Sequence, residues 1–361
     1  MGAVVVGGLA AVLVLAAYLT QPPPKGANAT SPLPSGSARP VAFEYHVAPD
    51  GSDRATGSAS EPWASLSFAL EQLRPGDTLL VHGGTYREDL NPRIVAGTPN
   101  ARITVRGAAG ERPVVKGLVR LQDPDHWTIE NLGFSWGGGD FDDHMVKVSS
   151  GTGWVLDGIR VHGSKSRAGL LIAASSEDGS PQDYTLRNSV VSDSQRGANL
   201  YLNPGLDSRG GLIEHNIFTG SPTENLKVGY GGDCGDQSDP LNGAADITVR
   251  NNTLFDGGQP LTVAEPADRI TVTGNIIGRG RRGMLLRLDG QCGNLGSDIT
   301  VWNNLGYDAD RWCEEFDSPL RCREVDGGGN LFPHDPRFDT EEVNGFQPQD
   351  PIAAQFGRFA P

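Results

Sequence analysis

ITVRNNTLF (247–255) is the stretch that decides the fold, because the chain of 361 residues returns to this phrase in altered form. Each copy is a short alternating apolar strand that ends at Asn, Gly or His and continues into a second apolar step. Alternation of this kind predicts a half-buried β-strand. The other copies are WTIENLGF (127–134), WVLDGIRV (154–161), YTLRNSVV (184–191), GLIEHNIF (211–218), ITVTGNII (270–277) and ITVWNNLGY (299–307).

The turn position of the copies recurs at intervals of 27, 30, 27, 36, 23 and 29 residues. A repeat of this length without a helical stripe is typical of an all-β solenoid in which each repeat is one coil of strands. Asn and Gly at the turn suit a left-handed backbone bend, and stacked Asn side chains could bond their neighbours in a ladder. The turn residues are Asn131, Gly158, Asn188, His215, Asn251, Gly274 and Asn303.

A second set of strands lies between these phrases and also alternates, as in MVKVSS (145–150) and NLKVGY (225–230). Alternation places one face in the core and the other outwards. The residues expected inside are Val146, Val148, Leu171, Ala173, Leu200, Leu202, Leu226, Val228, Leu261, Val263, Leu286 and Leu288. The outward column, one residue per coil, is then Lys147, Ile172, Tyr201, Lys227, Thr262 and Arg287.

Residues 2–20 contain no charged side chain and precede a Pro/Ser/Gly-rich stretch at 21–42. The segment is long enough to span a bilayer as an anchor, and a cleaved signal peptide is the alternative. Under either interpretation the rest of the chain is exported, so we expect an extracellular protein, secreted or tethered to the membrane. The stretch 21–42 is then a disordered linker, and the solenoid domain occupies 43–361.

The formal net charge of −14 argues against nucleic acid or an anionic membrane surface as a partner. It also makes an acidic polymer an awkward ligand unless a cation or a local basic patch intervenes. We expect the protein to be a monomer.

Four cysteines fit an oxidising compartment. Cys313 and Cys322 are close enough in sequence to close a small loop, which leaves Cys234 and Cys292 to pair. Their strands are expected two rungs apart, roughly 9–10 Å. Because this exceeds the reach of a disulfide, about 7 Å between Cα atoms, their loops would have to bend together, and free thiols are the alternative.

The opening of the solenoid domain carries a resemblance to a known family. VAPDGSD (47–53) and PWASLSFALEQLRPGDTLLVHGGTY (62–86) are similar to the start of right-handed parallel β-helix proteins of the pectate-lyase-like superfamily. The resemblance implies that a helix within 60–73 caps the N-terminal end, where the first coil would otherwise expose its core. DPRF (335–338) and PQDPIA (348–353) resemble the tails of such proteins, so the tail is expected to pack over the C-terminal end.

NLKVGYGG (225–232) resembles the segment that carries the catalytic lysine in family-9-type pectate lyases. The resemblance implies that Lys227 is the base that removes the proton next to a uronate carboxylate before β-elimination, for which the lysine must be neutral. Tyr201 would stack on a sugar or protonate the leaving oxygen, and Arg287 would hold a carboxylate. Further substrate contacts on this face are expected from Asn199, Asn203, Asn225, Tyr230 and Lys147.

The chain departs from that family in its acidic residues. The stretch QRGANLYLN (195–203), where those lyases place aspartates for Ca2+, has none, so the candidate calcium ligands are Asp140, Asp142 and Asp143. The sequence therefore leaves two interpretations open. The protein is an exported polysaccharide lyase that cleaves uronate-containing glycans, or it is a non-catalytic carbohydrate-binding or scaffold solenoid at the cell surface.

Overall fold

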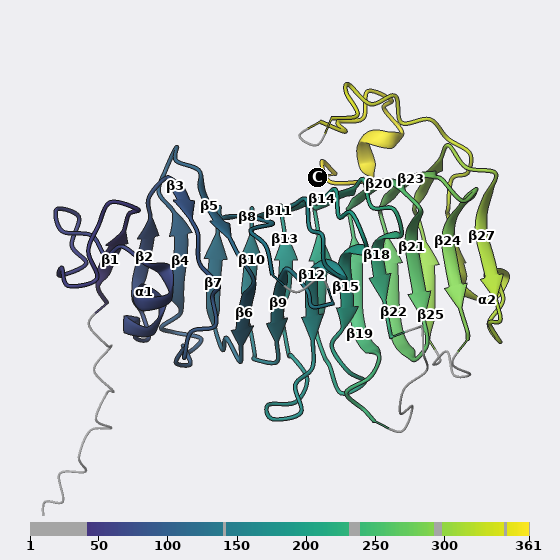
Figure 1. The fold of residues 1–361 in the computed structure, drawn as a ribbon. Coiled ribbons are helices and arrows are strands. Elements are labelled where there is room, and N and C mark those ends of the chain that lie inside the picture. Colours follow the sequence, from purple (N-terminus) through teal and green to yellow (C-terminus); the bar gives the residue numbers. More distant parts are fainter. Residues whose placement is uncertain (1–41, 140–141, 231–238, 292–297, 343–344, 361) are drawn as a thin grey trace, which may run out of the picture. The chain divides into compact units, whose positions relative to one another are not determined.

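The computed structural model describes residues 42–139, 142–230, 239–291, 298–342 and 345–360. In these residues parallel strands stack into three sheets that surround one main hydrophobic core (Figure 1). The stack makes about nine turns, and most coils contribute one strand to each sheet. The predicted all-β parallel β-helix solenoid is therefore confirmed. The few helical segments are α1 (Leu66–Gln72), α2 (Cys322–Val325) and the 3₁₀ turn η1 (Ala353–Gln355).

The three sheets are named here by their strands in spatial order. The first sheet contains β1 (Glu44–Val47), β2 (Thr78–Val81), β4 (Ile103–Gly107), β7 (Trp127–Glu130), β10 (Val155–Asp157), β13 (Thr185–Arg187), β16 (Gly211–Glu214), β19 (Ala244–Arg250), β22 (Ala267–Thr273), β25 (Ile299–Trp302) and β28 (Asp326–Gly328). The second sheet contains β3 (Gly84–Tyr86), β5 (Pro113–Lys116), β8 (Gly133–Ser135), β11 (Arg160–His162), β14 (Val190–Ser192), β17 (Ile217–Thr219), β20 (Thr253–Gly257), β23 (Ile276–Gly280) and β26 (Leu305–Tyr307). The third sheet contains β6 (Val119–Gln122), β9 (Val146–Ser149), β12 (Ala168–Ala173), β15 (Ala198–Asn203), β18 (Glu224–Val228), β21 (Gln259–Ala264), β24 (Met284–Asp289) and β27 (Arg311–Phe316).

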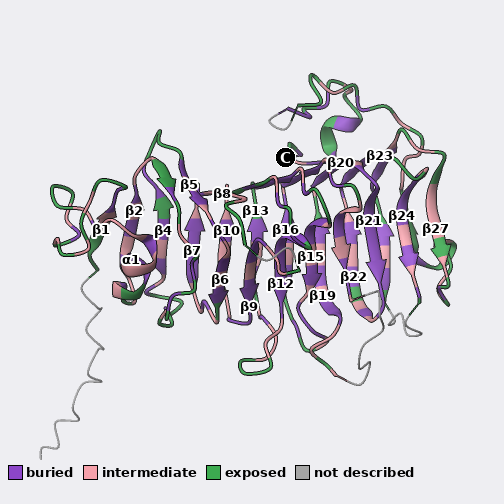
Figure 2. Cartoon of the chain, in the orientation of Figure 1, coloured by how far each residue is buried: buried purple, intermediate pink, exposed green. Residues whose placement is uncertain are grey.

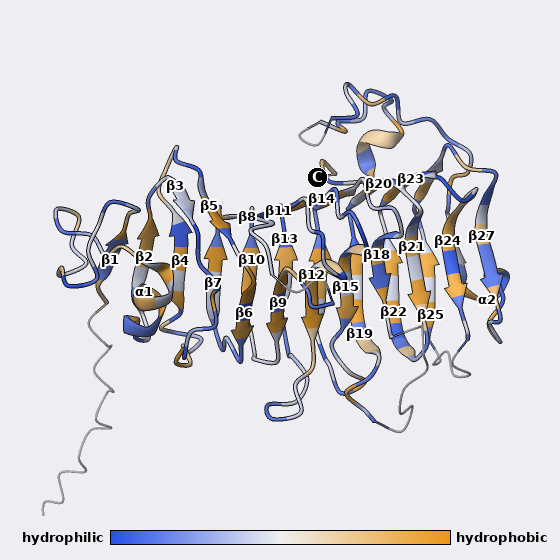
Figure 3. Ribbon diagram, in the orientation of Figure 1, coloured by the Kyte–Doolittle hydropathy of each residue, from blue (hydrophilic) through white to orange (hydrophobic). Residues whose placement is uncertain are grey.

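Successive coils pair residue for residue, so equivalent side chains form files along the stack. Buried residues occupy the strands in Figure 2, and the apolar residues concentrate in the same strands in Figure 3. Burying one aliphatic side chain stabilises the fold by roughly 1.5–3 kcal/mol, so these files supply most of the stability. The interior file of the third sheet, in which every residue is at most 2% exposed, is Val119, Val146, Leu170, Leu200, Leu226, Leu261 and Leu286.

In one coil, the side chains that point inwards are not the ones that the sequence predicted. In β12, Leu170 and Ile172 pair with interior residues, and Leu171 pairs with Lys147 and Tyr201 on the outer side. The prediction that Leu171 points inwards and Ile172 outwards was therefore wrong. All six residues of β12 are buried and apolar or small, so alternation gives no signal from which the phase could be read.

The predicted left-handed bend is present at all seven turn positions, where φ lies between 51° and 67°. A ladder of polar side chains is also present, but it is formed by the residue after the turn and begins only at Ser189, since Leu132 and Ile159 follow the first two turns. The amide oxygen of Asn252 accepts from the backbone N–H of Asn216 at 3.0 Å, and the amide oxygen of Asn275 accepts from the backbone N–H of Asn252 at 2.8 Å. The complete ladder is Ser189, Asn216, Asn252, Asn275, Asn304 and Asn330.

A helix, α1, lies within the expected range and adds Leu66 and Leu70 to the core, and its role as a cap stays a prediction. The tail lies elsewhere than predicted. It does not close the C-terminal end but runs back over the outer face of the second sheet, across β23 and β20 (Figure 1). Phe346 packs on Phe255 with ring centroids 5.2 Å apart, and the backbone N–H of Arg358 donates to Thr253.

Cys313 and Cys322 form the predicted disulfide. Cys234 and Cys292 lie outside the described residues, as do residues 2–20 and nearly all of the linker at 21–42. Within the described ranges, no helix combines the length and apolar character needed to cross a bilayer.

Replacing Asn252 by Ala should lower the free energy of unfolding by roughly 3–5 kcal/mol, because buried donors and acceptors on two neighbouring coils lose their partner. The measurement is urea denaturation followed by circular dichroism. Asn251→Gly is the matched control, because glycine tolerates the left-handed bend at this position, and it should change stability by less than about 1 kcal/mol. If both variants lost the same free energy of unfolding, the ladder would not be the main source of stability at this bend.

Candidate functional site

The outer face of the third sheet carries a row of residues from eight coils. The register places Tyr201, Lys227 and Arg287 in this row, as the sequence predicted, with Lys147 farther towards the N-terminus. Neighbouring residues of the row are separated by the strand spacing of about 4.8 Å. We call it the outer row, and its members are Arg120, Lys147, Leu171, Tyr201, Lys227, Thr262, Arg287 and Glu314.

Lys227 is the most desolvated cation of the row. Its ammonium nitrogen lies 5.0 Å from the centroid of the Tyr201 ring. Burial is the largest influence on its pKa and lowers it, and the positive charge of Arg287 acts in the same direction. The carboxylates of Glu224 and Asp289 oppose this change, but the net direction is downwards. Lys227 is therefore neutral more often than a surface lysine, which is the state that accepts a proton.

Tyr201 contacts Lys227 through its ring and is itself held by a hydrogen bond. Its hydroxyl donates to the backbone carbonyl of Tyr230 at 3.0 Å, and burial raises its pKa. The ring is consequently fixed under Lys227 in its protonated form. The proposed roles in stacking on a sugar or donating a proton would require this hydrogen bond to be replaced.

Arg287 is held by three neighbours. It forms an ion pair with Asp289 at 3.1 Å, and its guanidinium carbon lies 3.9 Å from the centroid of the Phe316 ring. With its amide oriented to satisfy its surroundings, Gln259 accepts from Arg287 at 2.7 Å and donates to Glu224 at 3.3 Å. Gln259 thus connects the arginine to the carboxylate that influences Lys227, a link that the sequence did not reveal.

A buried histidine, His144, lies beside the N-terminal part of the row. Arg120 forms an ion pair with Asp143 and donates to the backbone carbonyl of His144 at 2.8 Å. The His144 ring centroid lies 6.3 Å from that of Tyr201, and burial lowers the pKa of His144 to about 4. Arg167, in the loop before β12, is close enough to lower the pKa values of both His144 and Lys227. Neither Arg167 nor His144 was predicted from the sequence as a site residue.

The candidate calcium ligands have other partners. Asp142 forms an ion pair with Arg196 at 2.9 Å, and Asp143 pairs with Arg120. Asp140 lies outside the described residues. Within the described part of the chain, no group of three or more His, Cys, Asp and Glu side chains is placed to hold a metal. A guanidinium competes with a cation for the same oxygens, and Ca2+ binding by these aspartates stays a prediction.

Two of the five expected substrate contacts are in the interior. Asn199 and Asn225 are fully buried, and the side-chain amide of Asn199 donates to that of Asn225 at 2.9 Å. They join neighbouring coils at the bend before the third sheet, so their prediction as substrate-binding residues is corrected. The amide oxygen of Asn203 accepts from the backbone of Gly243, while Tyr230 and Lys147 remain partly exposed.

No protein-family model matches the chain. Pectate lyase PEL9 of Emericella nidulans is 28% identical over 113 residues, which cover 26% of this chain and 28% of that protein. The uncharacterized protein YwoF of Bacillus subtilis is 31% identical over 98 residues, which cover 24% of this chain and 21% of YwoF. The chain thus spans about a quarter of the curated relatives it matches.

Solved structures share the fold at low sequence identity. Pectate lyase Pel9A has a TM-score of 0.52 at 14% identity and covers 77% of this chain and 78% of its own. A rhamnogalacturonan lyase has a TM-score of 0.51 at 10% identity, covering 73% and 75%. A glycoside hydrolase has a TM-score of 0.53 at 10% identity, covering 80% and 96%. The chain therefore shares the parallel β-helix fold with these structures.

His144 should make stability depend on pH in a defined window. Its folded pKa of about 4 lies below the ordinary 6.5, so the unfolded chain binds the proton more readily between these values. Its contribution is unaffected above about pH 6.5 and falls by on the order of 2–3 kcal/mol as the pH decreases to about 4. Denaturation midpoints measured across this range should show a smaller loss for His144→Asn than for wild type. His162→Asn, which replaces an exposed histidine, should follow wild type, and identical pH profiles for all three proteins would contradict the assignment.

Proposed function

We propose that this protein is an exported polysaccharide lyase that binds a uronate-containing glycan along the outer row and cleaves it by β-elimination. The observation that carries the proposal is Lys227, a desolvated lysine with a lowered pKa in a row that also contains Arg120, Lys147 and Arg287. The local cations answer the objection that a chain of charge −14 repels an acidic polymer. The disulfide between Cys313 and Cys322 supports export.

In the proposed reaction, neutral Lys227 takes the proton from the carbon next to the uronate carboxylate. The electron pair of that C–H bond becomes a carbon–carbon double bond, and the bond to the glycosidic oxygen breaks. Arg287, two strands away at about 9.6 Å, orients a carboxylate of the polymer. Because the Tyr201 hydroxyl donates to Tyr230, we assign protonation of the leaving oxygen to water.

The likeness to proteins described as pectate lyase and rhamnogalacturonan lyase supports an activity of this class. A binding or scaffold protein without catalysis is the second candidate. It is favoured by the ion pairs that already occupy Arg287, Asp142 and Asp143, since a lyase of the resembled family would need metal-binding aspartates near its lysine.

Lys227→Met should abolish formation of the unsaturated product, a loss of at least about 100-fold, because the general base is removed. Purified protein would be incubated with a panel of uronans, with and without Ca2+, while the ultraviolet absorbance of the product is followed. The melting temperature should be nearly unchanged, since methionine keeps the aliphatic packing. Lys116→Met, on β5 of the second sheet, is the matched control and should cleave normally.

A Lys227→Met protein that cleaves as well as wild type would remove the lysine from the mechanism. Wild-type protein that binds a uronan but yields no unsaturated product in any arm would establish the binding protein instead.

The pH dependence of cleavage should move in opposite directions in two further variants. Activity rises with pH as Lys227 loses its proton. Glu224 raises the pKa of Lys227, so Glu224→Gln should move the rising limb of kcat/KM to lower pH. Arg287 lowers that pKa, so Arg287→Gln should move the limb to higher pH and also weaken substrate binding. Shifts in the same direction would show that another group controls the limb.

A further inference from the structure

The outer face of the second sheet changes character along the solenoid. Its C-terminal half lies under the tail, and the outward residues there, Ile217, Thr253, Ile276 and Leu305, are fully buried. The same file continues towards the N-terminus as Val190, Arg160, Gly133 and Val114. Beyond Val190 the residues of the file are no longer buried, because Arg160 is exposed and Gly133 and Val114 are partly exposed.

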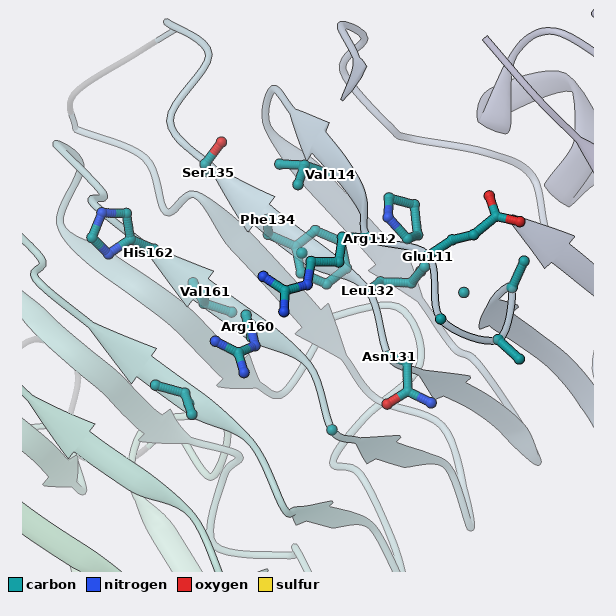
Figure 4. Close-up of a pocket in the computed structure, with 18 of the residues that line it drawn as sticks. Glu111, Arg112, Val114, Asn131, Leu132, Phe134, Ser135, Arg160, Val161 and His162 are labelled. Carbon is teal, nitrogen blue, oxygen red and sulfur yellow. The ribbon is translucent and has the colours of Figure 1, made fainter. Parts of the chain in front are cut away.

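A pocket of about 590 Å³ lies over this open half (Figure 4). Leu132 and Phe134, both 5% exposed, belong to its lining, and residues 108–112 of the loop between β4 and β5 form one wall. Gly133 leaves the floor without a side chain, and a Cβ there would come within 3.1 Å of Val114. The pocket thus combines a small apolar surface with the space for a ligand of several rings, a size usual for binding sites.

The charged groups of the pocket are predominantly basic. Arg112, from the loop between β4 and β5, and Arg160, on β11, both belong to the lining (Figure 4). Glu111 also lines the pocket, and its carboxylate accepts from the backbone of Gly83 at 2.5 Å and contacts His82 at 3.2 Å. Arg358 of the tail lies near enough to Arg160 for the two charges to interact, with burial the larger influence on its lowered pKa. His162 at the rim pairs with Asp193 at 3.2 Å.

We propose that this pocket is a second glycan-binding site, which takes an acidic oligosaccharide through Arg112 and Arg160. The excess of cationic groups in a chain of charge −14 selects an anionic ligand. The amide of Asn131, which is also in the lining and exposed, suits sugar hydroxyls beside the apolar floor. This inference rests on the proposed function for one point, the choice of an acidic sugar as the class of ligand. The pocket is on a different sheet from Lys227, so it would anchor the polymer without taking part in cleavage.

The test is calorimetric titration with galacturonate and guluronate hexasaccharides, and with a neutral galactose hexasaccharide for comparison. Titrations are made in the Lys227→Met background so that the probe stays intact. We expect an acidic hexasaccharide to show two binding events and the neutral hexasaccharide to show none. Arg160→Gln should weaken one event by about tenfold or more and leave the other in place. Arg187→Gln, which removes an exposed arginine of the first sheet, is the control and should change neither event.

Several results would overturn the second site. These are a single binding event lost only with Arg287→Gln, unaltered binding in Arg160→Gln, equal affinity for the neutral hexasaccharide, or no binding at all. Binding that depends on Arg160 in a wild-type protein without lyase activity would support the pocket while the proposed catalysis fails. Cleavage by wild type with a single binding event at the outer row would sustain the catalysis and remove the pocket.

Discussion

The structure depends on the hydrogen-bonded ladder of buried side chains at the bend between the first and second sheets. Each coil must change direction there inside a dry core, where an unpaired backbone amide is costly. An asparagine after the left-handed turn solves this, because its amide oxygen accepts from the backbone of the preceding coil. The same bond prevents one coil from slipping against the next. In the coils from Ser189 onwards, this corner therefore helps to align the files of residues inside and outside.

That alignment explains how a site can exist without a deep cavity. Tyr201, Lys227 and Arg287 are far apart in sequence, yet the register sets them on one face at fixed spacing. Neighbours in the row remove water from Lys227, and charges beside the row adjust its proton affinity. Because positions on adjacent coils are equivalent, a change of one residue type in a row alters the surface locally while the fold is maintained.

The fold was predictable from sequence because the repeat is local and alternation is clear in most strands. Prediction failed where the physical signal is absent. β12 is apolar throughout, so its phase could not be read, and Asn199 and Asn225 looked outward by alternation although the chain bends at that point. The outer row was found because it follows from register. The contributions of Arg167, His144 and Gln259 were missed because they arise from loops and coil ends, whose approach no periodicity encodes.

The returning tail gives the solenoid a property that stacked coils lack. In a simple stack each coil touches only its neighbours, so the end can fray one coil at a time. Here Arg358 donates to the carbonyl of Asn188, 170 residues earlier. Phe346, Ala353 and Phe356 pack on strands of the second sheet, and together with Arg358 they form what we call the clasp. For the C-terminal coils to unfold from their end, the clasp must first detach from the second sheet. The C-terminal coils should consequently melt as one block, and a protease should meet them intact until the clasp opens.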